Sequence, residues 1–298
     1  MKINLIGLVL FFSSTCCFAK SNIDITHVVL DLKFDLQKRH ALGSATIFLT
    51  LLEASDSVYL DAGNLKIFEI QSDNLALSYT YAGGEETNNL CIALPKRQQA
   101  GAQICIRIRY ATTHENRSDP YAIWGSFGKG LRFIEPTAVS PSKRKQIWSS
   151  GEPNSNKFWF PCKHDIKDIH TTEIIGTIEK PLLFISNGDL VSIKENEDNT
   201  RTFHYKTKRP FPNYLVSITA GEYADIQQQH RGIPIHTLGY PDEGDAVKAT
   251  TVALPKMIQF LETKTGYAYP FNHYTQVAVQ DYPFPGKVGQ HNSCLISD

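Results

Sequence analysis

Apolar and polar residues alternate along most of the chain up to Tyr223. Between Val28 and Leu36 the sequence reads Val-Val-Leu-Asp-Leu-Lys-Phe-Asp-Leu, which puts every second side chain on one face of a strand. Turn residues such as Gly63 interrupt this pattern at short intervals. Further strands are predicted at 45–52, 56–61, 65–71, 75–81, 89–94, 103–110, 173–179, 183–186, 201–206 and 214–220. Many short strands at this spacing indicate a mostly β domain, either an antiparallel sandwich or an open barrel.

The pattern changes after Tyr223. Residues 233–238 predict one more strand, 245–265 predict the first long helix, and 274–279 predict a strand after it. Asp242 or Asp245 can cap the start of the helix, Gly266 ends it, and Pro255 predicts a kink inside it. These elements indicate the beginning of a second, mixed α/β domain. The apolar face of the predicted helix comprises Ala246, Val247, Thr250, Leu254, Met257, Ile258 and Leu261.

Residues 1–19 have the pattern of a signal peptide. Lys2 supplies a positive start, residues 5–12 form an apolar run, and Cys17-Phe-Ala19 offers a cleavage site of small residues. This run is too short to span a bilayer, and no later segment approaches the ~18 apolar residues of a spanning helix. We therefore expect an exported protein, periplasmic or secreted, with no membrane span after cleavage. An uncut anchor, or a lipoprotein that uses Cys16 or Cys17, is the alternative.

Charge and composition limit the partners. The 298 residues include 30 Lys and Arg and 30 Asp and Glu, and 42% of them are hydrophobic. A net charge of zero argues against nucleic acid or anionic lipid as an obligate partner. The apolar content and the length are sufficient for two globular domains.

Cys91, Cys105, Cys162 and Cys294 remain after signal cleavage. Cys91 and Cys105 lie in two alternating apolar runs, and both are expected on the wetter face of their strands. If the two runs pair as a hairpin, the side chains face each other, and a disulfide between Cys91 and Cys105 can form in an exported protein. Two free thiols are the other outcome. The sequence has no Cys-x-x-Cys pair, which argues against a thiolate metal site.

Three blocks of sequence carry a resemblance to a known family. The first block begins Gln146-Ile-Trp-Ser-Ser-Gly-Glu-Pro and ends Phe158-Trp-Phe-Pro-Cys162, and Ser186-Asn-Gly188 follows it. The second contains Tyr214-Leu and Ala220-Gly-Glu-Tyr223, and the third is Val279-Gln-Asp-Tyr-Pro-Phe-Pro-Gly286. In this order they resemble the zinc aminopeptidases of the aminopeptidase N and leukotriene A4 hydrolase family. The resemblance covers residues 25–298.

This resemblance implies a saddle-like antiparallel β-sandwich at 20–225 and the first α/β elements of a thermolysin-like catalytic domain at 226–298. Members of that family hold zinc with His-Glu-x-x-His and a downstream Glu, and the zinc activates water that hydrolyses peptides at their N-termini. No two of the ten histidines here are four residues apart, so this chain lacks that pair. We therefore expect no zinc ligand and no catalytic residue in this chain, and zinc only in a full-length relative.

The resemblance also places the substrate contacts. The family has a Gly-x-Met-Glu-Asn loop, whose Glu binds the free α-amine of the substrate, and a Gln that precedes Gly-Glu-Pro. Those positions fall on Gly286, Lys287, Val288, Gly289 and Gln290, and on Ser150. Gly289 cannot pair with a cation, and Lys287 repels an amine, whereas Gln290 can act as a neutral acceptor. Both contacts to a free α-amine are therefore altered.

For the other polar residues, a structural role is favoured over a catalytic or metal-binding one. The spacing of His164 and His170, with Asp165 and Asp168 between them, suits neither one helix face nor a zinc knuckle and indicates a polar loop. Glu152 is expected to tie a loop through hydrogen bonds, and Asp281 to be solvated or capping. The run from Lys143 to Lys145 indicates a solvated loop. Ser149-Ser150-Gly151 does not have the form of a nucleophile elbow.

Two functions follow from these patterns. The first is the N-terminal part of an exported zinc aminopeptidase-like metallopeptidase, inactive in this form and cut off before its zinc motif. The second is a complete, non-catalytic, exported β-sandwich protein that binds peptides or a protein partner. The altered Gly289 loop and the missing zinc motif favour the second, whereas the end at Asp298, inside a strand-turn-strand unit, favours the first. A metal-free hydrolase using Asp281 and Glu152 is a weaker third hypothesis.

Overall fold

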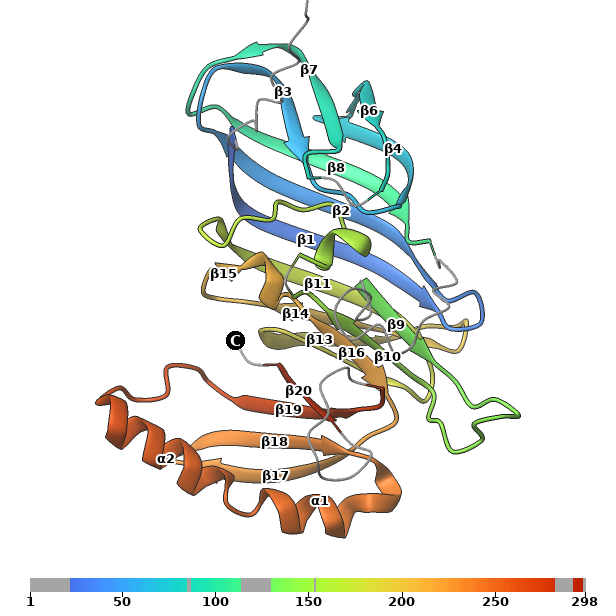
Figure 1. Ribbon diagram of the computed structural model, residues 1–298, viewed down its shortest axis with the longest axis vertical. Helices are drawn as coiled ribbons and strands as arrows, with labels where there is room; N and C mark the ends of the chain where they lie inside the picture. Colours follow the sequence, from blue (N-terminus) through green and yellow to red (C-terminus); the bar gives the residue numbers. More distant parts are fainter. Residues whose placement is uncertain (1–21, 85–86, 114–129, 153, 282–291, 297–298) are drawn as a thin grey trace, which may run out of the picture.

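The computed structural model describes residues 22–84, 87–113, 130–152, 154–281 and 292–296. Within these residues the strands form four sheets (Figure 1). The largest has nine strands in the order β13-β14-β11-β1-β2-β8-β4-β5, with β15 paired to β11. Its strands are β1 (Ile23–Asp35), β2 (His40–Leu51), β4 (Lys66–Ser72), β5 (Leu75–Ala76), β8 (Gln103–Ala111), β11 (Ile169–Glu179), β13 (Asp189–Glu195), β14 (Thr200–Lys206) and β15 (Phe211–Pro212).

The large sheet forms from the alternation seen in the sequence. In β1, Val28, Leu30 and Leu32 are buried and the residues between them are more exposed. The sheet is mixed, however, because β1 pairs antiparallel with β2 and parallel with β11. The expected fold class, a mostly β sandwich, is confirmed, and the pairing of β1 with β11 is a parallel exception among its antiparallel strands. The residues that pair in parallel, such as His27 and Thr171, lie far apart in the chain. A parallel pairing of this kind is not joined by a tight turn, so no turn motif in the sequence predicts it.

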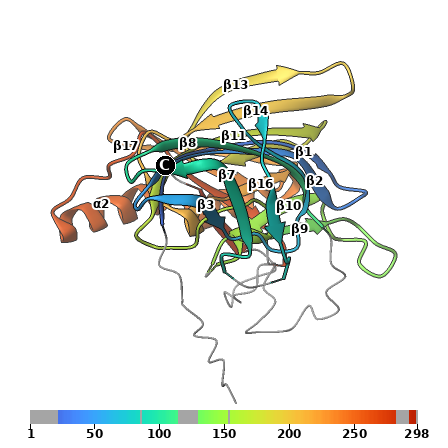
Figure 2. The same ribbon diagram turned by 90° about the horizontal axis from the view of Figure 1, so that it is seen from above.

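Two smaller sheets form the second layer of the sandwich (Figure 2). One consists of β3 (Ser55–Leu60), β7 (Leu90–Gln98) and β6 (Tyr79–Tyr81). The other consists of β12 (Leu183–Ser186), β16 (Ile218–Gly221), β10 (Gln146–Ser150) and β9 (Gly130–Ile134). Two 3₁₀ turns, η1 (Asn156–Phe158) and η2 (Asn213–Leu215), lie near them in the chain. One continuous apolar core includes Ile47 and Ile108 of the large sheet, Val58 and Ile92 of the first small sheet, and Ile147 and Ile218 of the second.

A fourth sheet begins at Ala224 and contains a strand-helix-strand unit. Its order is β17 (Ala224–His230), β18 (Ile233–Gly239), β19 (Tyr274–Val279) and β20 (Asn292–Ile296). β18 and β19 are parallel, and the chain between them forms η3 (Pro241–Glu243), α1 (Gly244–Thr251) and α2 (Leu254–Thr265). The helices lie along β17 and β18 (Figure 1). This is the α/β unit that the sequence predicts after the β domain.

The predicted helix at 245–265 is two helices. Pro255 lies in the first turn of α2, where a missing N–H costs nothing, so the chain restarts a helix instead of kinking one. The predicted caps are wrong, because neither helix has a side-chain cap, although Gly266 ends α2 in the left-handed conformation. The predicted apolar face is also not buried as one surface: Ile258 is buried, but Met257 and Leu261 are 57% and 59% exposed.

Candidate functional site

β10 is the strand that carries the first block of the resemblance. It pairs with β9 on one side and β16 on the other, and Gln146, Ile147, Trp148 and Ser149 are buried. Ser149 accepts the backbone N–H of Ile218 at 2.9 Å through its hydroxyl. Ser150, opposite Gly130 at the end of the strand, is only partly buried. Ser150 is therefore the residue of this block at which the strand reaches the surface.

The loop after Ser150 is tightly packed around Gly151. A Cβ atom at Gly151 would lie 2.1 Å from the carbonyl oxygen of Tyr214 and 2.8 Å from Nδ2 of Asn156, so only glycine fits. Asn156 donates from Nδ2 to the carbonyls of Asn213 (2.6 Å) and Val216 (3.0 Å) and accepts from Nε1 of Trp159 at 2.6 Å. These bonds join the loop to η2.

Glu152 takes part in this loop through its backbone. Its carbonyl accepts a hydrogen bond from the Ser155 hydroxyl at 3.0 Å, and the side chain is exposed. The expected loop-tying role is thus performed by the main chain. The aromatic part of the block is buried: Trp148, Trp159 and Phe160 are among the largest fully buried side chains, which fits an anchor better than an exposed binding platform.

The first and third blocks of the resemblance meet in the structure. Gln146 donates from Nε2 to the carbonyl of Ala278 at 3.0 Å and accepts the N–H of Gln280 at 2.9 Å. The indole Nε1 of Trp148 donates to the carbonyl of Gln280 at 2.9 Å. Gln146 Nε2 also lies 2.5 Å from the Tyr223 hydroxyl, at the end of the second block. Burial of Tyr240 beside them raises its pKa to about 12. The segments that contain Tyr223, Tyr240 and Gln280 therefore all meet at β10, although they are distant from one another in sequence.

Asp281 follows this junction and forms ion pairs. It contacts Lys143 and lies 3.5 Å from Arg132, and its backbone is left-handed with φ 59°. Arg144 pairs with Asp242 at 2.8 Å and with Glu243 at 2.9 Å, with its guanidinium 4.2 Å from the centre of the Tyr240 ring.

The solvated-loop interpretation of the run from Lys143 to Lys145 is therefore wrong. Lys145 pairs with Glu179 of β11, so each of the three basic residues binds a different acidic segment. No short sequence pattern identifies these acids, because Glu179, Asp242, Glu243 and Asp281 lie far from the basic run in the chain. We refer to these three basic residues and their four acidic partners as the charge clamp.

The loop at Gly286–Gln290 lies outside the described residues. The predicted contacts of Gly286, Lys287, Val288, Gly289 and Gln290 with a substrate amine therefore stay predictions, as does that of Ser150. Asp281 marks the place where the described chain leads into this loop.

The residues that the structure describes do not fit a zinc ion. Among the described residues, no group of three or more His, Cys, Asp or Glu side chains could hold a metal ion. The backbone N–H of His164 donates to Asp61, and His170 is buried with its Nδ1 3.3 Å from the carbonyl of Thr171. Burial is the main cause that lowers the pKa of both imidazoles.

Asp168, between these histidines in the sequence, has an unusual environment. Its Oδ1 accepts the N–H of Ile25 at 3.1 Å, and its buried Oδ2 has no hydrogen-bond partner within the described chain. Burial raises the pKa of Asp168 to about 7, and the negative charges of Asp24 and Asp165 act in the same direction. The carboxyl anchors the start of β1, and the polar-loop interpretation missed this because burial of Asp168 is not visible in the sequence.

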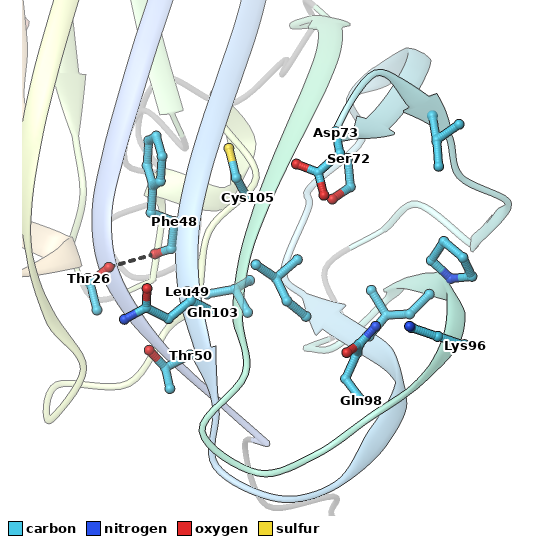
Figure 3. Close-up of a pocket in the computed structure, with 14 residues that line it drawn as sticks. Thr26, Phe48, Leu49, Thr50, Ser72, Asp73, Lys96, Gln98, Gln103 and Cys105 are labelled. Carbon is cyan, nitrogen blue, oxygen red and sulfur yellow. Dashed lines mark hydrogen bonds between the residues drawn. The ribbon is translucent and has the colours of Figure 1, made fainter.

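The expected hairpin between the two cysteine runs is not formed. Cys91 lies in β7, which pairs with β3 and β6, whereas Cys105 lies in β8, which pairs with β2 and β4. Both are free thiols, which is the second of the two outcomes that the sequence left open for Cys91 and Cys105. Both cysteines are half-buried, in agreement with the alternation of their strands. The alternation cannot show, however, that the consecutive strands β7 and β8 belong to different sheets. Cys105 instead lines an open pocket of about 730 Å³, near Phe48, Asp73 and Gln103 (Figure 3).

No helix among the described residues has both the length and the apolar character needed to cross a membrane.

Comparison with known proteins agrees with this arrangement. A leucine aminopeptidase 2 of Candida glabrata is 23% identical over 202 residues, which are 67% of this chain and 28% of that protein. A transcription initiation factor TFIID subunit 2 of Gallus gallus is 26% identical over 155 residues, which are 51% of this chain and 13% of that protein.

The solved structure of native yeast LTA4 hydrolase matches with a TM-score of 0.66 and 21% identity. The match covers 85% of this chain and 37% of that structure, and at this identity it shows the fold alone. This chain thus spans between 13% and 37% of the length of these relatives. Residues 24–215 match the peptidase M1 N-terminal domain, and the chain therefore belongs to that family.

Proposed function

We propose that this chain is the N-terminal part of an exported M1-type zinc aminopeptidase and that it does not hydrolyse peptides by itself. The observation that carries the proposal is the junction at β10. Gln146 and Trp148 hold the backbone at Ala278 and Gln280, directly before the segment that resembles the substrate loop of zinc aminopeptidases. A β domain joined to a strand-helix-strand unit in this way supports a role in shaping a substrate site rather than in supplying its chemistry.

The chemistry has to come from residues outside this chain. The 298 residues contain no His-Glu-x-x-His motif, so they supply neither the two histidine ligands of the zinc nor the glutamate general base of such an enzyme. This chain contributes Ser150 at the end of β10 and the segment after Asp281. In the longer protein these residues would orient the N-terminus of a peptide, with a neutral rather than an acidic contact to the amine.

The first experiment is to determine the sequence encoded after codon 298 and to express both lengths. We expect a His-Glu-x-x-His with a downstream Glu in the longer protein, stoichiometric zinc bound to it, and hydrolysis of leucyl-p-nitroanilide that a chelator abolishes. The 298-residue chain should bind no stoichiometric zinc and show no hydrolysis. Robust hydrolysis by the purified 298-residue chain in the presence of a chelator would contradict the proposal and favour the metal-free mechanism.

A second function is a non-catalytic binding protein. The specific observation in its favour is the likeness to TFIID subunit 2, a protein named for transcription initiation and not for peptide hydrolysis. Under this alternative, the sequence after codon 298 contains no zinc motif. The isolated chain should then be monomeric and unfold in one cooperative transition, because no apolar surface is left exposed by the absence of another domain.

A further inference from the structure

The outermost strand of the large sheet has an open edge. Within the described chain, β13 pairs only with β14, and Figure 2 shows this hairpin on the side of the molecule opposite β3 and β7. Ion pairs of 2.5 Å hold both ends of the strand, from Lys208 to Asp189 and from Lys180 to Glu195. Between them, Leu190, Val191 and Ile193 are 47%, 55% and 48% exposed. Exposed edges are usually protected by charge or proline, so four uncharged residues from Leu190 to Ile193 are unusual there.

A bulge in β13 brings two of these apolar residues to one face. Leu190 pairs with Tyr205, and Ile193 pairs with Phe203. Leu190 and Ile193 are three residues apart on β13, whereas Phe203 and Tyr205 are only two apart on β14. The extra residue is Val191, where the register shifts. Leu190 and Ile193 therefore share the face of Phe203 and Tyr205, and all four line one cavity from which Val191 is absent.

This cavity is an apolar groove between β13–β14 and the fourth sheet. Its volume is about 530 Å³, within the range of pockets that hold small ligands. Besides the β13–β14 face, its apolar wall includes Leu183, Phe184, Pro234 and Leu238. In Figure 1 the fourth sheet lies beyond β13 at the lower end of the molecule. An edge strand and an apolar groove thus lie side by side.

The polar rim of the groove carries negative charge. Asp189 lies 3.6 Å from His273, and Asp225 lies 2.9 Å from His236. The hydrogen bond from Lys208 holds the pKa of Asp189 below its usual range, so this carboxylate is ionised at neutral pH. Apart from the two imidazoles, two carboxylates face one ammonium group, that of Lys208. The rim is therefore complementary to a basic residue.

We propose that β13 is a docking edge for an extended peptide segment of a partner protein. The segment adds to the sheet as a further strand, directs alternate apolar side chains into the groove, and places a Lys or Arg at the rim near Asp225. Main-chain hydrogen bonds then supply affinity and the groove supplies specificity, as in other cases of strand addition. The groove contains Thr275 at the start of β19, whereas Gln280 follows its end, about 17 Å away along an extended strand. The proposal is therefore independent of peptide hydrolysis at the candidate site.

The test uses the full chain and two labelled peptides, acetyl-Thr-Leu-Thr-Val-Thr-Lys-amide and the shifted acetyl-Leu-Thr-Val-Thr-Lys-Thr-amide. We expect saturable binding of at least one peptide by fluorescence anisotropy. N-methylation of alternate main-chain amides should weaken it about tenfold in one of the two alternating sets and about twofold or less in the other. That contrast reports strand pairing and needs no protein variant.

Matched protein variants locate the groove. Ile193→Gln should weaken binding about tenfold, whereas Val191→Gln, on the same strand and equally exposed but outside the groove, should change it about twofold or less. Asp225→Asn should remove the preference for Lys over norleucine at the basic position. Circular dichroism confirms that each variant is folded, as expected for exposed side chains.

Three results would overturn the proposal. One is the absence of saturable binding by both peptides. Another is equal loss of affinity in the Ile193→Gln and Val191→Gln variants, or equal tolerance of both sets of N-methyl groups. The third is reversible dimerisation that Ile193→Gln abolishes and that the peptides do not compete with, which would assign the edge to a second copy of this chain.

Discussion

At the scale of single residues, the structure gives buried groups properties that their sequence positions do not suggest. Asp168 is the clearest case. Its carboxyl has a pKa of about 7 in the folded protein and an ordinary value near 3.8 in the unfolded chain. The folded state therefore binds the proton more tightly, and the resulting stability is present at low pH and is lost as the pH rises through about 7.

Asp168→Asn removes this proton while keeping an acceptor for the N–H of Ile25. The wild type loses stability as the pH rises from 5 to 8, and the variant does not. We therefore expect the unfolding free energy of the variant, relative to that of the wild type, to rise by about 2 kcal/mol over this range. Urea titrations at pH 5, 6, 7 and 8 measure this difference, in which the contributions of His27, His164 and His170 cancel. Asp31→Asn, at an exposed position of β1, is the control. A difference that does not change with pH would contradict the assignment.

Gly151 is a second residue whose role depends on close packing. In the Gly151→Ala variant the new Cβ meets the Tyr214 carbonyl oxygen, a backbone atom that cannot simply rotate away. The variant should lose about 2–3 kcal/mol of stability. Gly244→Ala is the matched control, because nothing lies within 4 Å of its added Cβ and its backbone is helical. The midpoints of chemical unfolding compare the two, and equal midpoints would show that the loop after β10 relaxes easily.

At the scale of elements, the contact that matters most is the one between β10 and β19. Gln146 satisfies a carbonyl and an N–H of the β19 segment with one side chain. Replacing it with Met keeps the size but leaves both groups unpaired in a buried place. We expect a loss of about 2–4 kcal/mol and faster hydrogen exchange at the Gln280 amide. Gln103→Met, at an exposed position, should have little effect; unchanged protection of Gln280 would mean that Gln146 does not hold β19.

At the scale of the whole molecule, the charge clamp ties the β domain to η3 and to the end of β19 in the fourth sheet. Its basic side chains are about one-third exposed, so their pairs are worth more than fully exposed ones and are still weakened by salt. Replacing Lys143, Arg144 and Lys145 together by Met should cost about 1–3 kcal/mol at low ionic strength and less than half of that in 1 M salt.

Urea unfolding in 0.05 M and 1 M sodium chloride measures the effect. Lys33→Met serves as the control, since it breaks one well-exposed pair with Asp198 and should not change stability measurably. A loss for the triple variant that is the same at both salt concentrations would point to packing, such as the contact of Arg144 with Tyr240, and not to charge.

Much of the fold could be predicted from local patterns. Most strands of the large sheet follow the alternation at Val28–Leu36 and its repeats, because every second side chain must enter the core. The edge strand β13 has no such alternation and was not predicted. The strand-helix-strand unit after Tyr223 was also predicted. Short elements were missed where the pattern is too brief to be periodic: β9 has five residues, and the run predicted at 75–81 divides into β5 and β6.

The candidate site was predicted only in part. The sequence pointed to the segment that forms β10 and to the burial of the aromatic block, which the structure confirms. It did not indicate that Gln146 contacts the β19 segment, since those partners lie more than 130 residues away. For the same reason it assigned a solvated loop to residues that form the charge clamp.

The sequence by itself determined most of the strands, the buried face of those strands and the family that the chain resembles, because these depend on periodicity and on short motifs. Tertiary structure alone decided the parallel pairing of β1 with β11, the separation of Cys91 from Cys105, the raised pKa of Asp168 and the groove beside β13. The physical reason is common to all four. Each depends on which distant segments lie side by side, and sheet pairing is selected by the packing of the complete core rather than by any local sequence.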